Sequence, residues 1–263
     1  MDSRPLAIVT GASNGIGYEL SKQFAKNGFD LLITARSESI HEVAQELEQL
    51  GAKVETIQAD LATYEGVEQL YRKIQAANRP VDAIAINAGV GVGGEFARET
   101  ELEDELNLLN LNVVSSVHLA KRVIKDMVDR GKGRVLFTSS IAALMPGPFE
   151  AVYAASKAFL RSFSQAIRNE LKETGVTVTA LMPGPTETDF FHRADMDDTK
   201  AGEIKKDDPE QVAKQGFEAL MAGKDEVVAG SLITKVQGAV AKVLPEQVKT
   251  ALHGKLAEPE SAK

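Results

Sequence analysis

Short apolar runs, rich in β-branched residues, alternate along this chain with longer stretches of helical periodicity, and this alternation constrains the fold most. Strands are predicted over residues 6–10, 31–34, 53–58, 81–86, 134–138 and 176–181. The runs are nearly continuous in apolar character, as in strands that helices cover on both faces. We therefore predict an α/β fold with a doubly wound parallel sheet and right-handed crossovers.

Length and composition narrow the class of protein. The 263 residues suit one domain over 1–263, and no linker or internal repeat divides them. A net charge of −8 argues against a nucleic-acid partner, which requires a clustered basic surface. The absence of cysteine excludes disulfides and thiolate metal sites. The first apolar run is too short for a secretion signal, and no window is long enough for a membrane span, so a cytoplasmic protein is expected.

A glycine-rich turn, Gly11-Ala12-Ser13-Asn14-Gly15-Ile16-Gly17, follows the first predicted strand and opens a helix. Small residues let the backbone approach a pyrophosphate, whose charge suits a helix N-terminus. The spacing is G-x-x-x-G-x-G and not the G-x-G-x-x-G of the common dinucleotide motif. The turn therefore favours a nucleotide site, while a glycine turn that binds nothing remains the alternative.

The end of the second predicted strand indicates which nucleotide would bind. It reads Thr34-Ala35-Arg36-Ser37, without the acidic residue that usually accepts the ribose 2′-hydroxyl of NAD(H). A guanidinium can instead bind a 2′-phosphate in a bidentate fork. Arg36 and Ser37 therefore favour NADP(H) over NAD(H), the alternative being an exposed arginine at the start of a helix.

A tyrosine four residues before a lysine occurs twice, at Tyr18…Lys22 and at Tyr153…Lys157. Four positions along a helix bring both side chains to one face, but the pattern alone carries little information. Ser140 stands thirteen residues before Tyr153 at the end of a predicted strand, whereas Pro5 holds that position before Tyr18. The second pair is therefore the catalytic candidate, and the first is expected to be ordinary helix surface.

With these motifs in place, the chain resembles the short-chain dehydrogenases/reductases of the single-domain type, from Leu6 to about Thr188. The resemblance implies a Rossmann-type sheet of about seven strands and an NADP(H)-dependent oxidoreductase acting on a carbonyl or alcohol. It rests on motifs that occur in the family's order. These are the glycine turn, Asp60, Asn87-Ala88-Gly89, Asn112, Ser140, Tyr153, Lys157, Pro183-Gly184 and Thr188.

The resemblance also implies a role for each residue. Tyr153 would be the general acid/base, with a pKa lowered by Lys157 and the oxidised nicotinamide. Ser140 would orient the substrate oxygen, Lys157 would bind the nicotinamide ribose, and Asn112 would support a water chain. Besides Tyr153 and Lys157, the nucleotide would contact Gly11, Ser13, Asn14, Gly15, Ile16, Gly17, Arg36, Ser37, Asp60, Leu61, Asn87, Ala88, Gly89, Pro183, Gly184 and Thr188.

Three assignments leave an alternative open. Ser139 adjoins Ser140, and strand alternation lets only one of them face the substrate. Asn110 competes with Asn112 in a long helix predicted over 102–128. Asp60 is either an adenine contact or the N-cap of the next helix. The four histidines, His41, His118, His192 and His253, have no spacing typical of a triad or metal site, so no metal is expected and the histidines are read as unrelated.

The remainder bears on substrate and assembly. Residues 189–208 are expected to form a substrate lid, and 231–258 a helical extension. Phe190, Phe191, Leu144, Met145 and Phe149 are candidate apolar walls, which hint at a hydrophobic carbonyl substrate. By resemblance, a homodimer or homotetramer would form through helices over 102–128 and 152–172. A non-catalytic NADP(H)-binding redox sensor and an NAD(H)-using dehydrogenase are the competing functions.

Overall fold

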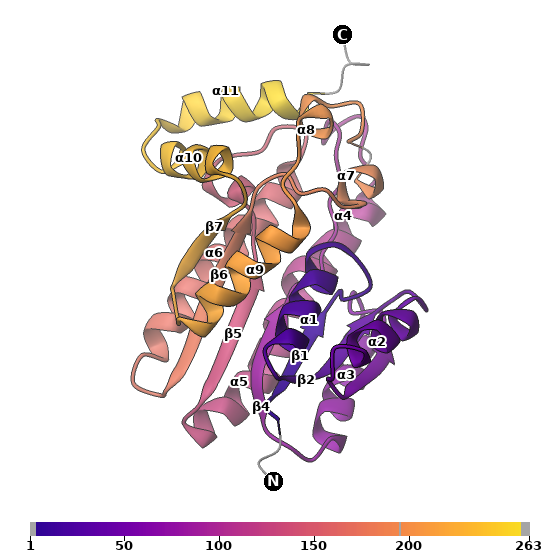
Figure 1. The fold of residues 1–263 in the computed structure, drawn as a ribbon. Coiled ribbons are helices and arrows are strands. Elements are labelled where there is room, and N and C mark those ends of the chain that lie inside the picture. Colours follow the sequence, from indigo (N-terminus) through magenta and orange to yellow (C-terminus); the bar gives the residue numbers. More distant parts are fainter. Residues whose placement is uncertain (1–3, 195, 259–263) are drawn as a thin grey trace.

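The computed structural model describes residues 4–194 and 196–258, and seven strands within them form one parallel sheet in the order β3-β2-β1-β4-β5-β6-β7 (Figure 1). The strand order reverses between β1 and β4, so the Rossmann-type sheet predicted from the sequence is confirmed. The strands are β1 (Leu6–Thr10), β2 (Asp30–Ala35), β3 (Val54–Gln58), β4 (Val81–Ile86), β5 (Gly133–Thr138), β6 (Val176–Pro183) and β7 (Glu226–Ala229).

Alternate side chains of each central strand enter opposite halves of the core. Ala7 and Val9 of β1 pack into one apolar cluster, whereas Leu6 and Ile8 pack into the other, and all four are buried. A strand buried on both faces needs apolar residues at successive positions. This explains the continuous runs in the sequence.

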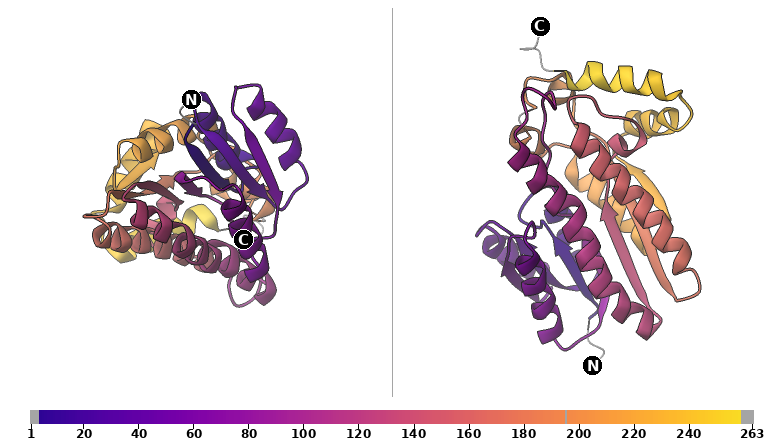
Figure 2. Two further views of the ribbon diagram at one scale, coloured as in Figure 1. Left: turned by 90° about the horizontal axis from the view of Figure 1, so that it is seen from below. Right: turned by 180° about the vertical axis from the view of Figure 1, so that it is seen from behind.

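Helices cover both faces of the sheet (Figure 2). One cluster joins the sheet to helices that include Phe24 and Phe217, whose rings meet edge to face at 5.2 Å. That layer consists of α1 (Gly15–Lys26), α2 (Ile40–Glu48) and α9 (Pro209–Met221). The other layer consists of α3 (Tyr64–Ala76), α5 (Ser115–Arg130) and α6 (Ala151–Glu170).

The helix predicted over 102–128 contains an irregularity. It consists of α4 (Leu102–Leu109), a π-helical segment η1 (Asn110–Val114), and α5. A π-helical turn places one extra residue in the helix and frequently occurs at functional sites. The local pattern of apolar residues continues through it, so the sequence did not reveal this turn.

The C-terminal part adds helices beyond the carboxyl ends of the strands, at the top of Figure 1. Segment 189–208 holds two short helices, α7 (Phe190–Arg193) and α8 (Lys200–Glu203), and its residue 195 lies outside the described part. Asp208 caps α9, with Pro209 at its first position, a pair of residues typical of a helix N-terminus. After β7 come α10 (Leu232–Ala241) and α11 (Glu246–Ala257). Within residues 4–194 and 196–258, none of the helices combines the length and apolar character needed to cross a membrane.

Candidate active site

The glycine turn between β1 and α1 is compressed to a shape that only glycine allows. Gly11 and Gly15 have φ values of +65° and +54°. A Cβ on Gly17 would lie 2.1 Å from the carbonyl oxygen of Gly11, and one on Gly11 would lie 2.8 Å from Cα of Ala88. The backbone thus forms a tight cradle with no side chain at these three positions, at the N-terminus of α1, where amide groups and the helix dipole favour an anion.

The carboxyl ends of β2 and β3 extend this cradle. Arg36 is exposed and lines the pocket, and no hydrogen bond or ion pair engages its guanidinium among the described residues. Its backbone oxygen accepts a hydrogen bond from Nε2 of Gln58 at 2.9 Å, which holds the loop. Asp60 also lines the pocket, and its Oδ1 accepts from the backbone N–H of Ala62 at 3.0 Å. Thr63 caps α3, so the alternative that Asp60 is the N-cap is wrong.

Asn87, directly after β4, forms hydrogen bonds with the ends of β1 and β5. Its backbone N–H donates to Oγ1 of Thr10 at 2.9 Å, its Nδ2 donates to the carbonyl of Thr10 at 3.0 Å, and its Oδ1 accepts from Oγ1 of Thr138 at 3.0 Å. These bonds place the Asn87-Ala88-Gly89 segment along the pocket floor. A Cβ on Gly89 would lie 3.2 Å from Nζ of Lys157, so this floor reaches the catalytic candidates.

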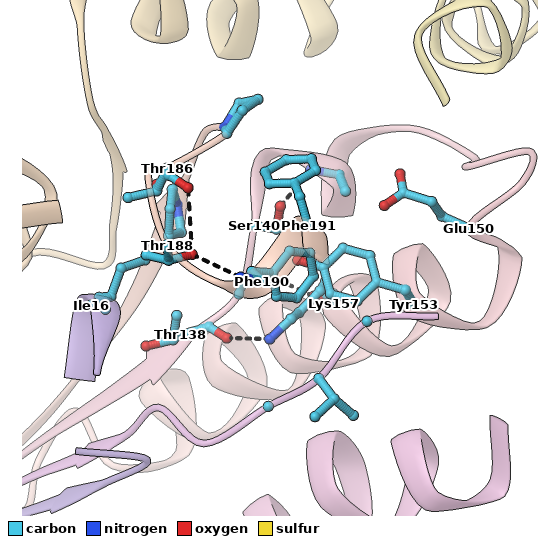
Figure 3. Close-up of a pocket in the computed structure, with 18 of the residues that line it drawn as sticks. Ile16, Thr138, Ser140, Glu150, Tyr153, Lys157, Thr186, Thr188, Phe190 and Phe191 are labelled. Carbon is cyan, nitrogen blue, oxygen red and sulfur yellow. Dashed lines mark hydrogen bonds between the residues drawn. The ribbon is translucent and has the colours of Figure 1, made fainter. Parts of the chain in front are cut away.

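Tyr153 and Lys157 lie one turn apart on α6 and point into the same pocket (Figure 3). Nζ of Lys157 donates to the carbonyl oxygen of Thr138 at 3.0 Å and lies 5.6 Å from the centre of the Tyr153 ring. Ser140 is hydrogen-bonded to the Tyr153 side chain. Ser139 instead donates to the carbonyl of Lys157 at 2.8 Å and is buried. The structure therefore brings Ser140, and not Ser139, to the tyrosine.

The pKa values of these two groups follow from their burial. Burial raises the pKa of Tyr153 above its usual range, the charge of Glu150 raises it further, and the bond with Ser140 lowers it. Burial also lowers the pKa of Lys157 to about 8. Protein groups alone thus raise the pKa of Tyr153, whereas the sequence predicted that Lys157 and an oxidised nicotinamide would lower it. Lys157 is not among the groups that change the pKa of Tyr153, and its Nζ donates instead to the carbonyl oxygen of Thr138.

Asn112 is fully buried within η1 and is not among the residues that line the pocket. Its Oδ1 accepts from the backbone N–H of Val90 at 2.9 Å, and its Nδ2 donates to the Val90 carbonyl at 2.9 Å and to Oγ of Ser156 at 3.1 Å. Asn110 is exposed. Asn112 therefore fastens the segment after Gly89 to α6, and it is the one predicted site residue outside the pocket lining among the described residues.

One pocket of about 1020 Å³ joins all the other residues predicted to take part in catalysis or nucleotide binding. The apolar walls include Phe190, whose ring centre lies 5.2 Å from that of Tyr153, and Phe191, which is buried. Leu144 is not among the lining residues and packs instead with Met182 and Ala241, and Phe149 packs beside Phe191 outside the lining. The predicted residues that line the pocket are Gly11, Ser13, Asn14, Gly15, Ile16, Gly17, Arg36, Ser37, Asp60, Leu61, Asn87, Ala88, Gly89, Met145, Ser140, Tyr153, Lys157, Pro183, Gly184, Thr188, Phe190 and Phe191.

The structure adds two polar residues to the pocket that the sequence did not reveal. His253 of α11 and Glu150, which precedes α6, are buried and lie 2.7 Å apart from Nε2 to Oε2. The sequence assigned His253 no role in the pocket, because a contact across 103 positions leaves no local pattern. Tyr18, by contrast, donates to Oε2 of Glu46 at 2.5 Å and lies outside the pocket lining, as expected. Among residues 4–194 and 196–258, no group of three His, Asp or Glu side chains could hold a metal ion.

Comparisons with known proteins give the same picture. Residues 5–199 match the short chain dehydrogenase family. The chain is 34% identical over 200 residues to the NADP-dependent 3-hydroxy acid dehydrogenase YdfG of Salmonella typhi, covering 75% of this chain and 79% of that protein. It is 27% identical over 249 residues to the very-long-chain 3-oxoacyl-CoA reductase of Rattus norvegicus, covering 92% and 76%. A short-chain dehydrogenase from Sphingobium yanoikuyae, solved in complex with NADPH, superposes with a TM-score of 0.79 at 27% identity, covering 85% and 87%.

Proposed function

This chain belongs to the short-chain dehydrogenase family, and on that premise we propose that it is an NADP(H)-dependent oxidoreductase that interconverts a carbonyl and a secondary alcohol. The observation that carries the proposal is the single pocket in which the glycine cradle of α1 and the Ser140–Tyr153–Lys157 group face the same space. The cradle fits a dinucleotide because its glycines allow a tight turn, in which any Cβ would meet neighbouring protein atoms, directly before the helix N-terminus that favours phosphates. NADPH in a solved relative and the name of a curated one support the choice of nucleotide.

The residues of the pocket suit proton transfer at a carbonyl oxygen. A bound nicotinamide supplies or accepts the hydride. Ser140 holds the substrate oxygen as a hydrogen-bond donor, and Tyr153 gives that oxygen a proton in reduction or takes one in oxidation. The carbonyl of Thr138 uses one of the three N–H donors of Lys157, which leaves the others for the nucleotide ribose. A phenol with a raised pKa is protonated at neutral pH, the form that reduction requires.

An assay of nucleotide consumption tests this function directly. We expect turnover of NADPH with members of a panel of aldehydes and ketones, and of NADP⁺ with the matching alcohols. Binding of the nucleotide without turnover of any carbonyl or alcohol would instead favour the redox sensor. Equal rates with NADH would favour the NAD(H)-using dehydrogenase.

Arg36 is the residue proposed to choose between the two nucleotides. Arg36→Asp replaces a donor fork with a carboxylate that repels the 2′-phosphate, so kcat/KM for NADPH should fall by roughly 10- to 100-fold, as expected for a lost charge-assisted bond. The value for NADH should hold or rise. Lys53→Asp, on the loop before β3 and outside the pocket lining, changes the charge equally and is the matched control. An unchanged NADPH/NADH ratio in Arg36→Asp would contradict the assignment.

The substrate pocket is proposed to take a hydrophobic carbonyl compound beneath a lid formed by residues 189–208. Phe190 supports this because its ring, on α7, packs against the ring of Tyr153, so the lid and the catalytic candidate are in contact. The extension over 231–258 contributes further pocket walls from α10 and α11. Cytoplasmic location and the boundaries of one domain over 1–263 stay predictions.

We also propose a homodimer or homotetramer through a helical surface made by the continuous helix α4–η1–α5 and by α6. Leu102, Leu106, Val114 and Phe159 of this surface are exposed by 65%, 49%, 56% and 42%, which is costly for apolar side chains in water. Light scattering should give twice or four times the 28.3 kDa of the chain. A mass of one chain at micromolar concentration would contradict this assembly.

A further inference from the structure

A buried carboxylate–imidazole pair joins the C-terminal helix to the catalytic helix. Nε2 of His253 in α11 lies 2.7 Å from Oε2 of Glu150, and both side chains are buried and line the pocket. A buried carboxylate without a partner is unfavourable, so this contact gives Glu150 the donor that burial requires. The resemblance to the family does not assign either residue.

Glu150 is positioned to influence Tyr153. It is the N-cap residue of α6, three positions before the tyrosine, and both side chains line the same pocket. Phe149 before it adopts a left-handed φ of 63°, unusual for a bulky residue, and its carbonyl accepts from the backbone N–H of Gly94 at 2.8 Å. The chain therefore maintains a strained conformation where it introduces Glu150, as is common at functional sites.

The orientation of this carboxylate matters for proton transfer. The charge of Glu150 stabilises the protonated form of Tyr153. A carboxylate free to turn toward the tyrosine would stabilise that form more by accepting its hydrogen bond. The N–H of His253 instead holds Oε2 toward α11, and this hydrogen bond screens part of the carboxylate charge from the tyrosine.

Anchoring of α11 does not depend on this pair alone. Ala257 packs in an apolar cluster with Phe191 and Met196, and Gly254 faces the ring of Pro148. These apolar contacts would hold α11 in place even without the carboxylate–imidazole pair. A purely structural role therefore leaves unexplained why a charged group is buried beside the tyrosine.

We propose that His253 is a positioning residue for proton transfer at Tyr153: it holds the Glu150 carboxylate away from the tyrosine hydroxyl, so that docking of α11 over the pocket prepares the tyrosine to ionise. The inference rests on the proposed function. The other charged groups that line this part of the pocket belong to α6, α7, α8 and α11, and they are Lys157, Arg193, Lys200, Lys249 and Lys255.

The test is the pH dependence of kcat/KM for alcohol oxidation with NADP⁺, in which Tyr153 must be deprotonated and the rate rises with pH through its ionisation. His253→Leu frees the carboxylate and should move this rise to higher pH, by on the order of one unit for a charge one helical turn away. Glu150→Gln removes the charge and should move the rise to lower pH. In the double variant, the loss of His253 should have no further effect, because the charge it controls is gone.

Leu256→Ala is the matched control, because it trims a pocket wall on α11 and retains the pair. We expect a raised KM and an unchanged pH profile. An unshifted profile in His253→Leu, or a shift that persists in the Glu150→Gln background, would overturn the inference. If His253→Leu does not fold, the shift in Glu150→Gln decides alone.

A measurement independent of turnover separates this inference from the proposed function. The chain has 4 tyrosines and no tryptophan, so the ultraviolet absorbance of tyrosinate can be titrated and the Tyr153→Phe curve subtracted. With NADP⁺ bound, the Tyr153 component should move upward in His253→Leu and downward in Glu150→Gln. The same midpoint in all three proteins would overturn the inference even if the wild type oxidises alcohols. Failure of the wild type on every substrate would count only against the function.

Discussion

Tyr153→Phe is expected to lower kcat by roughly 10²- to 10⁴-fold, the usual contribution of general acid–base catalysis. The substitution removes only the hydroxyl, and the ring keeps its packing against Phe190 and its place on α6. Nucleotide binding should persist, because the glycine cradle and Lys157 are untouched. Steady-state kinetics with NADPH, together with fluorescence titration of NADPH, would separate the two effects.

Tyr18→Phe is the matched control, because Tyr18 also stands four residues before a lysine. Its hydroxyl bonds Glu46 outside the pocket lining, a contact that raises its pKa to about 12. We expect unchanged kinetics in this variant. Full activity in Tyr153→Phe would remove the tyrosine from the mechanism.

Lys157→Met is expected to abolish turnover and at the same time to stabilise the fold. Burial lowers the pKa of Lys157 from 10.5 to about 8, so the folded state disfavours the charged ammonium by about 3 kcal/mol. Methionine removes this cost but leaves the carbonyl of Thr138 without its donor, at about 1 kcal/mol. The free energy of unfolding at pH 7 should therefore rise by about 2 kcal/mol.

The pH dependence of this gain has a definite sign. Below about pH 8 the lysine is charged in both folded and unfolded chains, so the full cost of burial applies to the wild type. Between about 8 and 10.5 only the unfolded chain holds the proton, and the cost fades as the pH rises. Urea unfolding at pH 7 and at pH 10 should show a larger gain at pH 7.

Lys22→Met serves as the control for a lysine in the same spacing from a tyrosine. Its Nζ pairs with the buried Glu19 at 2.9 Å, so its loss leaves a carboxylate unpaired and we expect a fall in stability, opposite in sign to the effect at Lys157. A destabilised Lys157→Met protein would show that contacts of the ammonium outweigh its desolvation.

Local patterns in the sequence predict much of this fold. The run Leu6–Thr10 is apolar at successive positions because both of its faces are covered, and this is visible in five letters of sequence. Asp208 followed by Pro209 marks the start of α9 equally well. Strand β7 was not placed by its residues, because four positions at the edge of a sheet are too few to show a period.

In the candidate site, too, local patterns in the sequence predict some features and not others. The glycines at 11, 15 and 17 can be recognised in the sequence because a Cβ at each would collide with a backbone atom or a neighbouring side chain. The spacing of Ser140, Tyr153 and Lys157 follows from one strand end and one helix face. The direction of the Tyr153 pKa did not follow from the motif. It depends on how completely the phenol is desolvated, and burial is a property of the packed molecule.

The sequence by itself thus determined the doubly wound sheet, and it predicted the glycine turn and the candidate catalytic group, because each depends on contacts between residues close along the chain or on a repeated strand–helix unit. Only the tertiary structure brought His253 to Glu150, buried Asn112 against Val90, and placed α11 at the pocket. Such contacts join residues far apart in sequence. Their energy depends on distance and desolvation in the folded chain, and neither quantity can be predicted from residues that are neighbours in the sequence.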